Sequence, residues 1–419
     1  MTVATYQSLP GGADGSDEVD GHHESGNGEH STLLFKGVCN TILGTGMLSM
    51  PYAVASWGSL PGGFLILVCG CMSWLGLHFL SRAATHTKPA RSSSFAALAD
   101  ITYPKASILF DSAIAIKCSG VATSYLIIIG SLMPRVVKSF DKDPPDWLLD
   151  RHLWIVVAMA ILSPLCYLRQ LHSLRFTSYI AVVAAVDLVF VVIYKFFDRS
   201  GLEPSSPKHL FAFSSSSVAN LPVYIFAFTC AQNIFSCYNE LKENTKGRMN
   251  LVTGVSIGSA ALIYELVGVL GYITFGENTP PNILSAYHDT LFINICRFGI
   301  VLCVLFGYPL QILPARNSLQ HLSSGQDTAV KHILLTTVLL FVTFLVSMNV
   351  DHLAIVLGII GSTGSTTISF ILPALFYLKL FPKSEWRGAR TCARILLCLG
   401  VIIMCVCLAL NMWHAVTGR

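Results

Sequence analysis

Charged residues are scarce in this chain of 419 residues. Asp, Glu, Lys and Arg make up 12% of it, whereas soluble domains usually contain about 25%. Apolar residues take their place, at 53%. This composition excludes an ordinary soluble domain and indicates an integral membrane protein surrounded by lipid. The net charge of +4 is small, so we expect no nucleic acid as a partner.

Motifs of enzymes and metal sites are also missing. The chain has 13 cysteines but no CxxC pair and no Cys/His cluster with metal-ligand spacing, and many of the cysteines lie inside apolar runs. No nucleophile–base pair or phosphate-binding loop stands in a supporting context. We therefore expect no enzyme, no catalytic residue, no metal and no cofactor.

Residues 1–31 lack the apolar side chains that a folded segment needs. They are rich in Gly, Ser, Asp, Glu and His, and no Lys or Arg precedes Lys36. Such a segment cannot offset the entropy of ordering, and it has no basic start or apolar run of a signal peptide. The sequence predicts a disordered acidic tail over 1–31, followed by one membrane domain over 32–415.

The membrane domain consists of apolar segments long enough to span a bilayer, which takes roughly 20 helical residues. We expect eleven transmembrane helices in an all-α protein, near 33–55, 60–84, 106–133, 152–168, 177–197, 217–238, 250–275, 290–313, 331–348, 352–378 and 391–415. With eleven crossings, 17 of the 27 Lys and Arg residues fall on the side of the N-terminus and 8 on the other. Because cytosolic loops carry the excess of Lys and Arg, this predicts a cytosolic N-terminus.

The first apolar segment is interrupted in its middle by Gly44, Thr45 and Gly46. Glycine is about 1 kcal/mol worse than alanine inside a helix, so the helix can unwind here at little cost. Unwound backbone in a membrane is tolerated where it is buried in protein or lines a cavity. The segment therefore predicts either a binding site near the bilayer midplane or a close-packing face against a neighbouring helix.

The sixth segment carries a polar cluster in its middle, formed by Thr229, Gln232 and Asn233. Unpaired polar groups are costly in lipid, so these side chains must face protein, water or a ligand. Interrupted helices in first and sixth place indicate a transporter built from two inverted repeats. The alternative is that the amides only join neighbouring helices.

Broken helices suit a substrate that carries both charges. The N–H groups of Thr45, Gly46 and Met47 lie at the start of a half-helix, whose positive dipole end binds a carboxylate. Carbonyl groups released on the other half-helix would accept an ammonium group or a cation. An amino acid carries both groups, which makes it the expected substrate.

Several motifs resemble the amino acid/auxin permease family, and within it eukaryotic vacuolar and related neutral amino acid transporters. They are the first apolar segment, GVATSYL at 120–126, FAFTCAQNIFSCYNELK at 226–242, GYITFG at 271–276 and YPLQILPAR at 308–316. The resemblance implies a LeuT-like fold in which helices 1–5 (about 33–197) and 6–10 (about 217–378) are inverted repeats and helix 11 (about 391–415) is an addition. It also implies transport of small amino acids with protons or sodium, and adds Tyr125 to the expected site.

Two departures from the family pattern concern the coupling ion. Ala231 stands where a histidine usually precedes Gln232, so no proton role carries over to that position. Asn40 matches the sodium-coupled branch, but the threonine that completes its cation site in helix 8 falls at or near Gly307. Glycine has no side-chain oxygen, so a proton is the better expectation than sodium.

Four ionisable residues inside the membrane are candidates for coupling or gating, because such residues are costly there and usually functional. Lys117 and Asp187 both lie near the midplane and either pair or leave one group neutral. A permanent ion pair that braces the bundle is the alternative. Glu265 and Arg297 form an expected second pair with a structural or gating role.

The sequence thus predicts a proton-coupled secondary active transporter of amino acids in an endomembrane such as the vacuole or lysosome, working by alternating access. One alternative is a sodium-coupled importer at the plasma membrane. The other is an amino acid sensor with little flux, whose acidic tail engages a cytosolic partner. The expected substrate-binding residues are Asn40, Gly44, Thr45, Gly46, Met47, Tyr125, Thr229, Gln232 and Asn233.

Overall fold

The computed structural model describes residues 44–87, 92–140, 143–168, 177–198, 206–241, 245–323, 328–382 and 387–417. Every regular element within these ranges is helical. The first group is α2 (Thr45–Trp57), α3 (Ser59–Ala84), α4 (Phe95–Thr102), α5 (Ser107–Phe140), α6 (Arg151–Cys166) and α7 (Thr177–Phe197). The second is α8 (Ser215–Ala227), α9 (Ile234–Glu240), α10 (Lys246–Phe275), α11 (Leu291–Leu322), α12 (Ala329–Asn349), α13 (Leu353–Ile360), α14 (Leu372–Leu380) and α15 (Arg387–Thr417).

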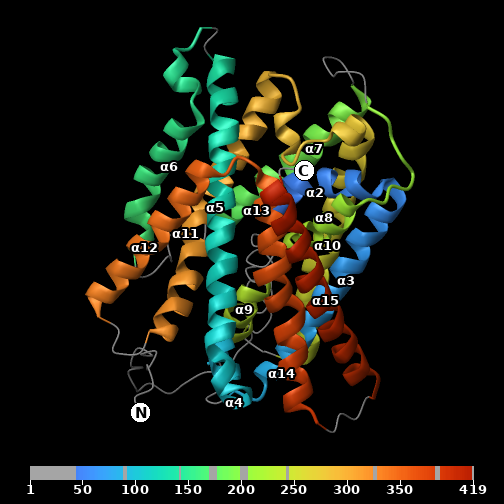
Figure 1. Ribbon diagram of the computed structural model, residues 1–419, viewed down its shortest axis with the longest axis vertical. Coiled ribbons are helices and arrows are strands. Elements are labelled where there is room, and N and C mark those ends of the chain that lie inside the picture. Colours follow the sequence, from blue (N-terminus) through green and yellow to red (C-terminus); the bar gives the residue numbers. More distant parts are fainter. Residues whose placement is uncertain are drawn as a thin grey trace, which may run out of the picture.

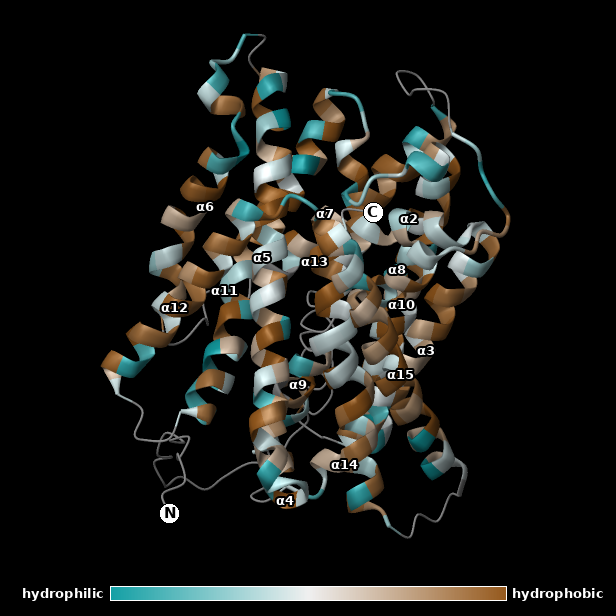
Figure 2. Cartoon of the chain, viewed as in Figure 1, coloured by the Kyte–Doolittle hydropathy of each residue, from teal (hydrophilic) through white to brown (hydrophobic). Residues whose placement is uncertain are grey.

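Within these ranges, nine helical segments are long and apolar enough to cross a membrane, and α6 is a shorter apolar helix. Figure 2 shows hydrophobic residues along the middle of the outer helices and hydrophilic residues towards their ends. The expectation of an all-α membrane protein is therefore confirmed. The first expected helix is described only from Gly44 onwards, and Asn40 and the tail over 1–31 lie outside the described residues. The number of eleven helices stays a prediction.

Side chains cap the starts of six described helices, which explains where those helices begin. In each case a hydroxyl or carboxylate oxygen accepts a backbone N–H of the first turn; the caps are Ser94, Asp150, Ser214, Thr245, Thr290 and Thr328. Helix α2 differs, because Gly44 precedes it with φ −130° and ψ −142° and supplies no side-chain cap. In its first turn the Met47 N–H donates to the Gly44 carbonyl at 3.2 Å.

Helix α5 runs through the middle of the molecule (Figure 1) and packs along α11 more extensively than any other pair of described helices does. Helices α6 and α12 lie against this pair on one side. On the other side, α2 packs between α8 and α10, and α3 packs along α10. The interrupted helices are therefore enclosed by continuous ones.

The expected tenth helix contains two π-helical segments, Gly361–Ser365 and Thr367–Ile371, between α13 and α14. Such wide turns occur frequently at functional sites. The close approach of this segment to its neighbours depends on glycine: a Cβ on Gly361 would lie 2.3 Å from the carbonyl oxygen of Pro222 in α8. The π-helical region therefore packs closely against α8 at Pro222, five residues before α8 ends.

Candidate substrate site at the two helix breaks

The expected sixth helix is interrupted where its sequence turns polar. Helix α8 ends at Ala227, a 3-10 turn follows at Ala231–Asn233, and α9 begins at Ile234. Helix α2 begins at the other expected interruption. The two breaks lie against each other, because a Cβ on Gly46 would be only 2.6 Å from the Cα of Ala227. A glycine is thus required where the two half-helices cross.

Hydroxyl groups from other helices satisfy the carbonyl groups that the α8 break exposes. Tyr264 of α10 donates to the Ala227 carbonyl at 2.9 Å, and Ser73 of α3 donates to the Phe228 carbonyl at 2.9 Å. Thr229 donates to Ile225 O at 2.7 Å and closes the end of α8 itself. These three hydrogen bonds keep the α8 break in a defined conformation. They pair its buried carbonyl groups, as buried polar groups need to be.

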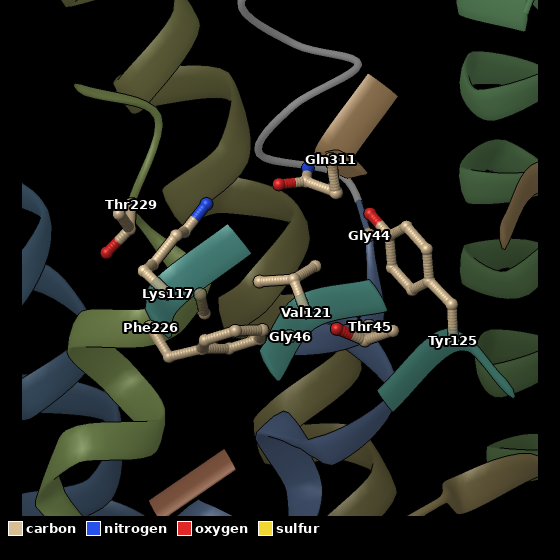
Figure 3. A pocket seen from close by; sticks show the side chains of 10 residues that line it. Gly44, Thr45, Gly46, Lys117, Val121, Tyr125, Phe226, Thr229 and Gln311 are labelled. Atoms are coloured by element: carbon tan, nitrogen blue, oxygen red, sulfur yellow. The ribbon is translucent and has the colours of Figure 1, made fainter. Parts of the chain in front are cut away.

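A small pocket with a cavity volume of about 20 Å³ lies at the two breaks (Figure 3). Three of its side chains come from α5 at intervals of four residues, which places them on one face of that helix. They are Lys117, Val121 and Tyr125. The other residues that line the pocket are Gly44, Thr45, Gly46, Phe226, Ala227, Thr229 and Gln311.

The pocket contains polar atoms without a partner. Thr45 Oγ1 and Gln311 Oε1 are buried, and neither has a hydrogen-bond partner in the part of the chain that the structure describes. Leaving such an atom unpaired in a protein interior costs about 1–3 kcal/mol. Because both oxygens accept hydrogen bonds and lie in the same pocket, they are suited to a ligand that donates them.

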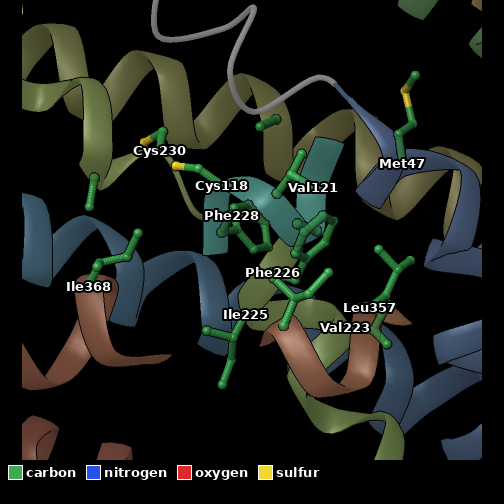
Figure 4. Close-up of a cluster of buried hydrophobic side chains, with 14 of the residues drawn as sticks. Met47, Cys118, Val121, Val223, Ile225, Phe226, Phe228, Cys230, Leu357 and Ile368 are labelled. Atoms are coloured by element: carbon green, nitrogen blue, oxygen red, sulfur yellow. The ribbon is translucent and has the colours of Figure 1, made fainter. Parts of the chain in front are cut away.

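Apolar side chains surround the polar part of the pocket. Figure 4 shows Met47, Cys118, Val121, Val223 and Phe226 among the buried residues near the breaks. Val121 and Phe226 also line the pocket. The site thus combines a few polar groups with an apolar wall, as small-molecule sites usually do.

Five of the nine expected substrate-binding residues line this pocket: Gly44, Thr45, Gly46, Tyr125 and Thr229. Met47 is buried, but it belongs to the apolar core and not to the lining. Gln232 and Asn233 lie in the 3-10 turn after the break and do not line the pocket either. Asn40 lies outside the described residues.

The sequence reasoning missed Gln311 of α11. A polar residue in the middle of an apolar helix is the same signal that identified Thr229, and Gln311 lies within the YPLQILPAR motif. Tyr264 and Ser73 were missed as well. Nothing local distinguishes them, because each pairs with a carbonyl group far away in the sequence.

Lys117 and Asp187 do not form an ion pair in the described part of the chain. Lys117 lines the pocket, whereas Asp187 of α7 lies beside Cys296 of α11. Asp187 lies in the middle of α7, whereas Lys117 lies nearer the start of α5, and the two side chains have different neighbours. Asp187 is not among the residues that line the pocket.

The expected pair of Glu265 and Arg297 is wrong. Arg297 is completely buried and forms its salt bridge with Asp289. Its guanidinium also donates to the Leu284 carbonyl at 3.1 Å and the Tyr287 carbonyl at 2.6 Å. Arg297 thus holds the connection between α10 and α11, while Glu265 lies beside Gly63 of α3. The structure supports the structural role that the sequence suggested for Arg297, with a different partner.

Metal-binding residues do not gather in the described ranges: no group of three or more His, Cys, Asp or Glu side chains there is placed to hold a metal ion. The pocket lining contains no acidic residue. Its one charged side chain is that of Lys117.

Comparison with known proteins gives a consistent result. The family model for transmembrane amino acid transporter proteins matches residues 34–417. Vacuolar amino acid transporter 5 of Schizosaccharomyces pombe is 38% identical, with 89% of this chain and 92% of the relative covered. Vacuolar amino acid transporter 5 of Saccharomyces cerevisiae is 33% identical, with 84% and 88% covered.

Among solved structures, MhsT in complex with L-phenylalanine is similar with a TM-score of 0.58 at 11% identity, covering 90% of this chain and 98% of MhsT. At this identity the similarity concerns the fold alone. It confirms the expected LeuT-like fold.

Proposed function

The chain belongs to the transmembrane amino acid transporter family, and from this premise we propose that it carries amino acids across an endomembrane by proton-coupled alternating access. The observation that carries the proposal is the pocket where the start of α2 meets the end of α8, in which two polar atoms, Thr45 Oγ1 and Gln311 Oε1, have no partner among the described residues. The family consists of transporters and not of enzymes, in agreement with the absence of catalytic motifs from the sequence.

The polar groups of the pocket complement an amino acid. The start of α2 has no side-chain cap, and among the described residues only the Met47 N–H of its first turn is paired, with the Gly44 carbonyl, so the N–H groups of Thr45 and Gly46 and the positive dipole end suit the carboxylate. Thr45 Oγ1 and Gln311 Oε1 are free acceptors for the ammonium group. Val121 and Phe226 leave an apolar space for the side chain. The cavity of about 20 Å³ would have to widen to admit even a small amino acid.

The packing of the helices supports alternating access. The half-helices α2 and α8 contact each other through Gly46, and α10 packs along α2. Helices α5 and α11 form a second, continuous pair on the other wall of the pocket. A movement of the first group against the second would expose the pocket to either side of the membrane in turn.

We propose protons as the coupling ion because the sodium-coupled branch has a threonine at or near the position of Gly307. Here the ring of Tyr125 fills the space beside Gly307. A Cβ on Gly307 of α11 would lie 3.0 Å from Cε2 of the Tyr125 ring. The Tyr125 hydroxyl lies 3.5 Å from the position of a Cβ on Gly44. An aromatic ring thus occupies the space between α11 and the start of α2, where a cation would need oxygen ligands.

The endomembrane location rests on the relatives, whose names describe vacuolar transporters. The distribution of Lys and Arg supports a cytosolic N-terminus. Exposed apolar side chains, such as Phe64 on α3 and Phe190 on α7, suit contact with lipid.

The proposal is tested by uptake of a panel of labelled amino acids into proteoliposomes with the purified protein. A pH gradient and a sodium gradient are imposed separately and in both directions, and empty liposomes serve as the control. Uptake that follows the pH gradient without sodium is expected. Uptake that requires sodium at constant pH would reject proton coupling. Binding of amino acids without flux under any gradient would favour a sensor.

A further inference from the structure

Lys117 is held in place at its base and extends into the pocket. Its Cβ packs against the π-helical segment, where a Cβ on Gly364 would be only 2.5 Å away. The same position on Gly364 would be 2.8 Å from the Ala113 carbonyl. Lys117 lines the pocket, and in the view of Figure 3 its amino group lies between Thr229 and Gln311.

The charge of Lys117 has no counter-ion in the described part of the chain. The residue is 2% exposed, and no salt bridge is formed by it among the described residues. The ionisable groups that face it are the thiols of Cys118, on its own helix, and Cys230, between α8 and the 3-10 turn. Residues 31–43, which precede Gly44 in the sequence, contain no Asp or Glu.

An ammonium group in this position needs an anion. Burying an unpaired charge in a membrane protein is costly, and such charges usually pair with one another, with carbonyls or with a ligand. The pocket supplies hydroxyl, amide and phenol groups but no carboxylate. The missing anion is therefore one that enters the pocket.

We propose that Lys117 is a substrate-binding residue whose ammonium group pairs with the carboxylate of the transported amino acid. This inference rests on the proposed function, in which the pocket binds an amino acid. The carboxylate is then held between Lys117 and the uncapped start of α2, and the substrate ammonium group is held by Thr45 Oγ1 and Gln311 Oε1. The ion pair forms only when substrate is bound.

The test compares each amino acid that the wild-type protein binds with the amide of the same amino acid. The two ligands differ only in the carboxylate. Equilibrium binding to the purified full-length protein is measured for the wild type and for Lys117→Met. Val121→Ala is the matched control, because Val121 lines the same pocket one turn further along the same face of α5.

In the wild type, the amino acid is expected to bind at least about 30-fold more tightly than the amide, since removing one partner of a buried charge pair costs 2 kcal/mol or more. Lys117→Met is expected to lower the affinity for the amino acid by a similar factor and to change that for the amide by less than about threefold. Val121→Ala is expected to change both affinities by the same factor and so to keep the preference.

Thermal unfolding of the ligand-free protein provides a second readout. Lys117→Met removes an unpaired buried charge, so its unfolding temperature is expected to equal or exceed that of the wild type. A clearly lower value would show that Lys117 pairs with a carboxylate of the protein itself and would overturn the inference.

Two binding results would also overturn it. If Lys117→Met weakens the amino acid and its amide equally, Lys117 only shapes the pocket. If the variant keeps the preference for the amino acid, another group binds the carboxylate. A wild-type protein that binds no amino acid would instead refute the proposed function on which the inference depends.

Discussion

Gly46 allows α2 and α8 to cross at the two helix breaks, and replacing it with alanine tests whether this crossing forms the transport site. An added Cβ would lie 2.6 Å from the Cα of Ala227 and 2.7 Å from its Cβ. Both atoms belong to a residue with no flexible side chain, so neither can move aside. The two half-helices would have to separate.

The size of the effect follows from these distances. Ordinary contact begins at 3.4 Å, so the separation must grow from 2.6 Å by 0.8 Å. Overpacking of this kind costs about 1–3 kcal/mol, partly offset by the gain of about 1 kcal/mol in helix propensity when alanine replaces glycine. A misplacement of about 1 Å in a site that positions its substrate typically costs about 100-fold in efficiency. We therefore expect Gly46→Ala to fold but to lose most of its transport, and Gly46→Val to lose all of it.

The assay is initial-rate uptake into proteoliposomes, with thermal unfolding in detergent as the measure of folding. Gly258→Ala is the matched control: Gly258 is an exposed glycine of α10, and a Cβ added there meets no atom within 4 Å. Gly258→Ala also replaces a glycine of a membrane helix with alanine, but without a clash. This variant should keep wild-type uptake.

Wild-type uptake by Gly46→Ala or Gly46→Val would refute the reasoning, because the two breaks could then separate without consequence for the substrate. Loss of uptake together with loss of folding would show that the crossing serves stability and would leave no specific role for the pocket.

Three further predictions concern residues around the site. Arg297→Ala leaves two carbonyl groups without their buried donor and should destabilise the protein by about 3–5 kcal/mol, seen as a lower unfolding temperature; an unchanged temperature would contradict the buried network. Tyr264→Phe removes the hydroxyl that donates to Ala227 O and should cost about 1–3 kcal/mol and weaken amino acid binding, whereas wild-type affinity would mean that the α8 break needs no such support. Gly307→Thr places a side chain against the Tyr125 ring and should reduce uptake without creating sodium dependence; sodium-stimulated uptake by this variant would show that the cation site lacked only one oxygen.

Most of the described membrane helices and the interruption of the sixth expected helix were predictable from local sequence. Long apolar runs form helices because lipid offers backbone groups no other partner. Gly44 and Gly46 weaken the first helix, and the polar cluster around Thr229 marks the interruption of the sixth. These signals lie within the segments themselves and need no knowledge of their neighbours.

The partners of the buried charges were not predictable in the same way. The sequence places Lys117 and Asp187 at a similar expected depth, yet the structure places one in the pocket and the other beside Cys296. Arg297 meets Asp289, only eight residues away, and not Glu265. Depth in the membrane can be counted along the chain, but the rotation of each helix depends on how its ridges pack against all its neighbours.

The sequence by itself determined a membrane protein in which the sixth expected helix is interrupted and α2 begins after Gly44, and its motifs indicated the family. Only the tertiary structure decided which side chains meet at the interruptions. Gln311 joins the pocket, and Ser73 and Tyr264 complete the α8 break, because these residues lie on helices far away in the sequence that packing brings together. The local sequence shows which polar groups need a hydrogen-bond partner. The fold decides which distant residue becomes that partner.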